Sequence, residues 1–320
     1  MSKFHVSPIE ESAAEIFWEM ASEASVFVKP SVLKILSYST DWWGCYQGST
    51  LVAVWPICRN EFGKVYTPEF TYYVGILFSN KFELQPNHRK LAYINYIYES
   101  FIQQFKNVYD NLSFSTSLTD IRYFLWQNHK EISGEKYTLT PRYTALISKI
   151  NESNKLDLES NFRPARRRHI KNALSQGFSI AITKKSNQIG EVLKMYQSTL
   201  DRQHASATQS TRYQIEKMLQ EIPEENSVCI NGYPNNSDKL AFFALIFHAK
   251  NTANLVLNLT DSDYRDTNIS SLGILECILA AKNIGCDIFD FNGANSPNRA
   301  DDKHSYGAEQ KLFFQIDGAF

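Results

Sequence analysis

The residues best suited to chemistry lie in the last third of the chain, around a polar loop. Between Leu255 and Gly293 an apolar stretch, this loop, an amphipathic stretch and a second apolar stretch follow one another. The loop holds Arg265, Asn268 and Ser270 in the spacing R-x-x-N-x-S. The first backbone N–H groups of a helix have no partner within it, so a loop leading into a helix can bind a phosphate, and an arginine adds a cation. The competing interpretation is a capped helix without a ligand, because Asn and Ser are ordinary N-cap residues.

Three residues after the loop could act on a substrate bound there. Asp290 lies near the end of the second apolar stretch, where ligands of open α/β sheets collect. Its carboxylate could accept a proton from an attacking ammonium, or it could pin the turn at Asn292 and Gly293 by hydrogen bonds. Lys303 could bind a carboxylate or phosphate of a substrate, or it is an exposed loop lysine. Tyr306 could donate a proton to a leaving thiolate or ester oxygen.

A basic segment upstream offers a second place for an anion. No acidic residue occurs between Ser160 and Gly190, and a helix is predicted over 164–176. On the helical wheel Arg166 lies near the apolar face and Arg167 flanks it. An unpaired buried charge is costly, so Arg166 requires an anion partner. That partner is either a protein carboxylate or a substrate phosphate.

Helices and strands follow one another in the same order in both halves of the chain. Helices are expected at 7–24, 86–105, 121–128, 164–176, 189–204, 211–221 and 271–285. Strands or extended segments are expected at 42–46, 51–59, 65–78, 112–117, 137–150, 227–230, 240–248, 255–260, 286–294 and 311–316. The polar stretch NESNKLD at 151–157 is the candidate linker. Hairpins mixed with β-α-β steps predict a mixed α/β sheet in each half.

Composition excludes several classes of function. The 320 residues carry 33 basic and 34 acidic side chains, a net charge of −1, so no charge excess points to DNA or to an anionic membrane. The five cysteines show no C-x-x-C spacing and no Cys/His ligand pairs recur, which indicates reduced core thiols and no metal. The first residues lack the apolar core of a secretory signal and the longest apolar run, 241–247, suits a buried strand, so a cytoplasmic protein without membrane insertion is expected. Motifs of P-loop enzymes, serine esterases and zincins are absent.

The polar loop resembles the pyrophosphate loop of the GNAT acyltransferases, Q/R-x-x-G-x-G/A between a strand and a helix. Arg265, Asn268 and Ser270 stand at its Arg, Gly and Gly/Ala positions. This sequence departs from the pattern at its two glycine positions, where Asn268 and Ser270 stand. Glycines there allow the backbone to approach the phosphates closely.

The residues that follow resemble the FemAB-like branch of this superfamily. Phe289-Asp-Phe-Asn-Gly293 and Lys303-x-x-Tyr-Gly307 are similar to its D-F-x-G … F-K-x-x-F-G ending. Arg166 to Ala173, followed by Gly177, is similar to its R-R-x-I-x-K-A … G segment. Trp55-Pro56 and the stretch from Thr67 to Gly75 extend the resemblance into the first half, so that it covers residues 40 to 316.

This resemblance implies an α/β protein of two tandem GNAT-like domains, each a mixed, mostly antiparallel sheet flanked by helices. We expect an N-terminal domain at 1–150 and a C-terminal domain at 151–320 that carries the acyl-donor site. The implied activity is N-acyl transfer from acetyl-CoA or another acyl-CoA to an amine, on a small molecule or an anionic peptide. One alternative is transfer from aminoacyl-tRNA to a peptidoglycan precursor or peptide. A tRNA partner is disfavoured because the net charge is near zero and no sustained heptad run offers a tRNA-binding arm. The other is a non-catalytic binding module.

Site residues follow from the same comparison. Asp290 and Lys303 are the candidate catalytic residues. The candidate residues for binding the phosphates of the donor are Arg265, Asn268, Ser270 and Ser271. The candidate residues for binding the acceptor are Arg166, Arg167 and Tyr306.

Overall fold

A computed structural model describes residues 4–21, 24–104, 111–118, 120–126, 130, 136–205 and 208–317. The chain forms two compact units, one of Met1–Arg142 with Leu312–Phe320 and one of Tyr143–Lys311. This division differs from the expected boundary after residue 150. The polar stretch at 151–157 lies within the second unit, and there Asn154 and Asp157 form a capping box that begins a helix.

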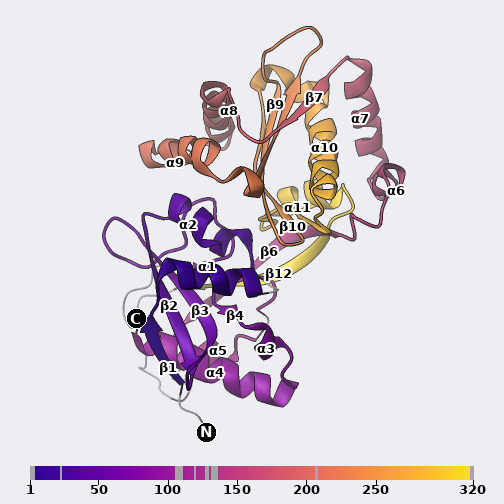
Figure 1. The fold of residues 1–320 in the computed structure, drawn as a ribbon. Coiled ribbons are helices and arrows are strands. Elements are labelled where there is room, and N and C mark those ends of the chain that lie inside the picture. Colours follow the sequence, from indigo (N-terminus) through magenta and orange to yellow (C-terminus); the bar gives the residue numbers. More distant parts are fainter. Residues whose placement is uncertain are drawn as a thin grey trace. The chain divides into compact units, whose positions relative to one another are not determined.

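The first unit contains a four-stranded antiparallel sheet in the order β1-β2-β3-β4 (Figure 1) and one strand, β5, that is not part of this sheet. Its strands are β1 (Phe4–Pro8), β2 (Ser39–Gln47), β3 (Thr50–Arg59), β4 (Leu77–Phe78) and β5 (Asn111–Ser113), and β5 pairs with β12 (Glu309–Asp317). Its helices are α1 (Glu11–Met20), α2 (Pro30–Leu36), α3 (Asn80–Glu83), α4 (Asn87–Gln104) and α5 (Arg122–Trp126), with a 3₁₀ turn at Val26–Val28. Helix α4 packs on β1 and β2, and aromatic side chains including Trp55, Tyr98 and Phe114 fill the core.

The second unit contains strands in the order β6-β11-β10-β9-β8-β7. These are β6 (Thr138–Ser148), β7 (Ser179–Thr183), β8 (Ser227–Tyr233), β9 (Phe242–Ala249), β10 (Thr252–Thr260) and β11 (Ile288–Asp290); β10 and β11 are parallel and the other neighbours antiparallel. Its helices are α6 (Lys155–Ser160), α7 (Pro164–Ser175), α8 (Ile189–Arg202), α9 (Gln209–Glu221), α10 (Ile269–Asn283) and α11 (Pro297–His304), with 3₁₀ turns at Glu224–Asn226 and Ser262–Thr267.

Helices cover both faces of this second sheet. Figure 1 shows α7 and α10 on one side of the strands and α8 and α9 on the other. Helix α10 packs on β8, β9 and β10. A glycine permits its close approach, since a Cβ on Gly273 would lie 2.3 Å from the ring of Phe242 on β9. This contact fixes the start of α10, and hence the candidate phosphate loop, against the sheet.

The α/β class and the mostly antiparallel sheets that the sequence predicts are confirmed, and individual elements differ. The helix expected at 7–24 is β1 followed by α1, and the extended segment at 65–78 is a strand only at its end, since the chain turns at Phe70 with φ 63°. Sequence reasoning missed the helices α2, α3, α6 and α11 and the exposed edge strand β7. Helices α2 and α11 begin with proline, which is a signal for a helix start. Predicted helix residues 22, 23, 105, 127 and 128 lie outside the described part of the chain.

The cysteines agree with the composition. All five thiols are free and buried, and burial raises the pKa of Cys58 and of Cys229 to about 12. Among the described residues, no helix combines the length and the apolarity needed to cross a bilayer.

Candidate functional site

The candidate site of the second unit lies where β10 and β11 separate. The two strands pair only from Thr252 to Asn254 on β10, opposite Ile288–Asp290. From Leu255 onward β10 continues without β11, and a register shift between Leu255 and Leu257 leaves Val256 without a partner on β9. Such a bulge unpairs backbone groups of the strand. The open edge of β10 is therefore a place where backbone N–H groups can bind another molecule.

Asp290 is buried at this point of separation. Its Oδ1 accepts hydrogen bonds from the backbone N–H of Asn292 at 2.8 Å and from the hydroxyl of Thr144. The first of these bonds is the turn-pinning contact that the sequence suggests for this carboxylate. Asp290 thus has a structural role in the turn, and its position next to the open edge of β10 also suits a proton acceptor.

Lys303 reaches the same turn from α11. Its Nζ donates to the carbonyl oxygens of Phe291 at 3.1 Å and Gly293 at 2.5 Å, and to that of Asn292. Burial lowers the pKa of the ammonium to about 8, and the nearby Asp290 carboxylate acts in the opposite direction. Lys303 is therefore a half-buried helical residue that holds the turn after β11. The alternative interpretation of Lys303 as an exposed loop residue is wrong.

Asn292 is a residue of this site that sequence reasoning did not select. Its side-chain Nδ2 donates to the carbonyl of Leu255 at 3.0 Å, across the gap between the strands. Its Oδ1 is buried and accepts no hydrogen bond from any residue that the structure describes. A buried acceptor without a donor is unfavourable. An N–H group of a bound amine would supply the missing donor.

Arg166 has the anion partner that its inward position requires. Its Nε donates to Ser305 Oγ at 2.7 Å, its Nη1 to Ser271 Oγ at 3.4 Å, and its Nη2 pairs with the Asp302 carboxylate. The guanidinium also lies 4.9 Å from the ring centroid of Tyr306. Of the two partners considered from the sequence, a protein carboxylate or a substrate phosphate, the structure shows the carboxylate, that of Asp302.

Tyr306 joins this network to the start of α10. It is buried, its hydroxyl donates to Ser271 Oγ at 3.3 Å, and burial raises its pKa to about 12. Tyr306 therefore keeps its proton at neutral pH. Together Arg166, Ser271 and Tyr306 tie α7, α10 and the residues after α11 to one another.

Two further arginines lie apart from this network. Arg265 points to α8, where its Nη2 donates to the carbonyl of Ser198 at 3.2 Å and to its Oγ at 2.8 Å. Arg167 is partly exposed on α7, and within the described residues its guanidinium has no ion pair or hydrogen bond. The structure thus brings together Asp290 with Lys303, and Arg166 with Ser271 and Tyr306, whereas Arg265 contacts a different helix.

Comparison with solved structures identifies this arrangement of elements. FemX matches over 97% of this chain and 96% of its own, with a TM-score of 0.65 and 12% identity. A tandem GNAT protein from the clavulanic acid biosynthesis pathway matches over 98% of both chains, with a TM-score of 0.54 and 10% identity. The chain has the FemAB-like tandem GNAT fold.

L-PGS from Bacillus licheniformis also matches, over 97% of this chain and 92% of its own, with a TM-score of 0.55 and 10% identity. At such low identity these likenesses show the fold alone. No protein-family model and no curated protein sequence matches the chain.

The loop before α10 keeps the backbone shape that the glycine of the GNAT pattern permits. Asn268, at the first Gly position, has φ 66° and ψ 8°, a left-handed conformation, and its side chain makes no capping hydrogen bond. Asparagine adopts this conformation more readily than most residues. The backbone geometry is thus retained without glycine. Of the two serines that follow, Ser270 is partly exposed and Ser271 is buried.

This conformation gives a prediction for stability. Replacing Asn268 by glycine is expected to leave the free energy of unfolding within about 0.5 kcal/mol of the wild type, since the side chain makes no cap. Replacing it by valine is expected to cost about 1–3 kcal/mol, because a β-branched residue is strained at positive φ. Urea unfolding monitored by circular dichroism measures both. Equal stabilities of the two variants would contradict the left-handed conformation.

Four residues of the site were missed by sequence reasoning. Thr144, Asn292, Asp302 and Ser305 supply hydrogen bonds to Asp290, to β10 and to Arg166. Asp302 and Ser305 flank Lys303, so the K-x-x-Y-G segment offered a signal for them. Thr144 lies in an extended segment with no local feature that singles it out.

Proposed function

We propose that the protein is an N-acyltransferase whose site lies in the second unit, where β10 and β11 separate. The proposed donor is acetyl-CoA or another acyl-CoA and the acceptor is an amine. One observation carries the proposal: buried Asp290 and the Lys303-held turn meet the unpaired edge of β10, where an acyl group and an amine can lie side by side. The shared fold with FemX and with the tandem GNAT protein supports it.

The reaction needs one nucleophile, one proton acceptor and support for the acyl carbonyl. The lone pair of the amine attacks the carbonyl carbon, and the C–N bond forms as the C–S bond to the carrier breaks. The backbone N–H of Val256 in the bulge stabilises the negative charge that develops on the carbonyl oxygen. The proton lost by the amine passes to Asp290, and the leaving thiolate takes a proton from solvent.

The other residues hold substrates or the turn. Asn292 Oδ1 accepts an N–H of the attacking amine and so orients its lone pair. Lys303 keeps the 291–293 turn in place through its carbonyl contacts. Arg167, on the outer part of α7, is the residue proposed to bind an anionic group of the acceptor, whereas Arg166 supports the site through Asp302.

The donor phosphates are proposed to bind at the start of α10. This helix has 15 residues, no acidic residue in its first turn, and a left-handed residue before it whose side chain does not cap the first N–H groups. Ser270 is partly exposed there. Arg265 contributes through its contact with α8, by holding the preceding 3₁₀ turn.

Titration calorimetry with coenzyme A and acetyl-CoA tests the donor. The wild type is expected to bind both, and Ser270→Glu to weaken binding at least about tenfold, because its carboxylate repels a pyrophosphate at the helix start. Ser262→Glu, an exposed residue of the 3₁₀ turn, is the matched control for the added charge. No binding of either compound to the wild type would eliminate the acyl-CoA donor.

Filter binding of aminoacyl-tRNA, with its salt dependence, is the second arm of this experiment. Binding of tRNA without coenzyme A would replace the proposed donor by an aminoacyl ester. Binding of coenzyme A without transfer to any amine of a panel would favour a non-catalytic module.

A further inference from the structure

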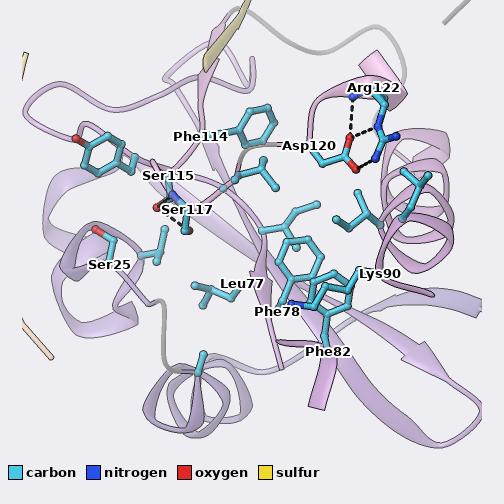
Figure 2. Close-up of a pocket in the computed structure, with 18 of the residues that line it drawn as sticks. Ser25, Leu77, Phe78, Phe82, Lys90, Phe114, Ser115, Ser117, Asp120 and Arg122 are labelled. Carbon is cyan, nitrogen blue, oxygen red and sulfur yellow. Dashed lines mark hydrogen bonds and ion pairs between the residues drawn. The ribbon is translucent and has the colours of Figure 1, made fainter. Parts of the chain in front are cut away.

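The first unit contains a cavity of about 450 Å³, and all residues that line it belong to this unit (Figure 2). Several polar side chains of the lining are paired with one another. Asp120 accepts from Arg122, from Nε at 2.9 Å and from Nη2 at 2.7 Å, and the hydroxyl of Ser117 donates to that of Ser115 at 3.1 Å. Because these four side chains find their partners within the chain, they do not select a ligand by its chemistry.

Asn254 of β10 differs from them, because it is a buried polar residue whose side chain lacks a partner. It is 3% exposed, and its amide makes no hydrogen bond to any residue that the structure describes. The amide carries one acceptor oxygen and two N–H donors. Burying such groups without partners is unfavourable. A bound molecule that pairs with the amide would supply these partners.

Asn254 lies in one row with the candidate proton acceptor. In the sheet it pairs with Asp290 of β11, and Asp290 pairs with Leu146 of β6. Residues that pair across strands point to the same face of a sheet, and so does Thr144, two residues before Leu146. The hydrogen bond from the Thr144 hydroxyl to Asp290 agrees with this placement. Asn254, Asp290 and Thr144 therefore form a polar row on one face.

This polar row points away from α10. The residues before and after Asn254 and Asp290 belong to the apolar core around that helix: Ala253, Leu255, Phe289 and Phe291. Side chains alternate between the two faces along a strand, so the residues between them face the other way. On the face of the row, Leu146 and Ile288 are partly exposed. A small molecule can therefore approach the row along β6 and β11.

The chemistry of the row favours an amine that carries a neutral amide. A carboxylate next to Asp290 would be repelled by its charge. A carboxamide or peptide group offers an acceptor and N–H donors, so it can pair with both the N–H and the oxygen of the Asn254 amide. Neighbouring strands lie roughly 4.8 Å apart. An amine and an amide on the same carbon can thus meet Asp290 and Asn254 at the same time.

We propose that Asn254 is a specificity-determining residue of the transferase, whose side-chain amide pairs with a neutral amide group next to the amine of the acceptor. This inference rests on the transferase activity proposed above. It adds that the acceptor is an α-amino amide or the N-terminus of a peptide, and not a free amino acid. The anionic group assigned to Arg167 then lies in a more distant part of the acceptor.

Transfer from acetyl-CoA to L-alaninamide and to isopropylamine tests this inference, because a carboxamide of the first replaces a methyl group of the second. In the wild type kcat/KM is expected to be higher for L-alaninamide than for isopropylamine or for L-alanine. The ratio of kcat/KM for L-alaninamide to that for isopropylamine is expected to fall at least about tenfold in Asn254→Leu and in Asn254→Ala. Comparing this ratio between proteins cancels the different basicities of the two amines. Asn172→Leu, at an exposed position of α7, is the control and should keep the wild-type ratio.

The stability of the same variants separates a role in binding from a role in the fold. Leucine has the branched shape of asparagine without its polar atoms, and alanine avoids any steric conflict. Since the amide makes no hydrogen bond within the fold, the melting temperature of at least one of the two variants should be no lower than that of the wild type. A large decrease in both would assign the amide to the fold and overturn the inference.

The kinetic results that would overturn it differ from those that would overturn the transferase. A ratio that neither variant changes, or a wild type that prefers isopropylamine or L-alanine, removes the role of Asn254 and leaves acyl transfer in place. The same holds for a wild type that acetylates other amines of a panel but not L-alaninamide. Absence of transfer to every amine of the panel would overturn the transferase itself, and the role of Asn254 with it.

Discussion

Replacing Asp290 by asparagine is expected to reduce the rate of acyl transfer between about 100-fold and 10,000-fold, the range in which positioned proton acceptors act. The amide cannot accept the proton that the amine loses on attack. It does keep an oxygen at the position of Oδ1, where the backbone N–H of Asn292 and the hydroxyl of Thr144 donate. The turn after β11 should therefore persist in the variant.

The rate is measured by release of free thiol from acetyl-CoA with an amine that the wild type accepts, at saturating concentrations of both substrates. Asp287→Asn is the matched control. Asp287 lies just before β11, so this substitution removes the same charge at a position away from the turn. A wild-type rate in Asp290→Asn would assign Asp290 to the turn alone. A loss of rate together with a large loss of stability would also point to a structural role.

Local sequence signals predicted the elements of the site because those signals act over a few residues. The apolar stretch of β10, the polar loop and the length of α10 all depend on neighbouring residues, and the structure has them in this order. The position of Asp290 at the end of β11 follows in the same way. What local signals could not predict is the backbone conformation at Asn268, since left-handed asparagine is a minority conformation even in loops.

Contacts between residues that are distant in the sequence could not be predicted either. Arg166 pairs with a carboxylate 136 residues away, and Arg265 is held by Ser198 on α8. Helical periodicity placed Arg166 on the inward face but left its partner open, because periodicity describes one element and not what packs against it. The resemblance to the FemAB-like pattern placed the segments in one site, and only the folded chain shows which side chains meet.

Replacing Lys303 by methionine is expected to lower the free energy of unfolding at pH 7 by about 1–3 kcal/mol. The variant removes the hydrogen-bond donor of the carbonyl oxygens in the 291–293 turn, and buried acceptors without a donor are unfavourable. Methionine matches the length of the lysine chain and removes only the amine. Urea unfolding measures the change, and Lys171→Met, an exposed residue of α7, is the control. Unchanged stability would show that these contacts contribute nothing to the fold.

The pH dependence of this difference gives a second test of Lys303. Its pKa falls from the usual 10.5 to about 8 on folding, because burial disfavours the ammonium. Between these two values the unfolded chain binds more protons than the folded one, so folding becomes more favourable as the pH rises. The cost of burying the charge is thus fully present below pH 8 and is relieved above it. Wild-type stability should rise relative to Lys303→Met above pH 8, by at most about 1.4 kcal/mol per pH unit. Parallel pH profiles for the two proteins would mean that Lys303 titrates as an exposed lysine, and the turn after β11 would then be open to solvent.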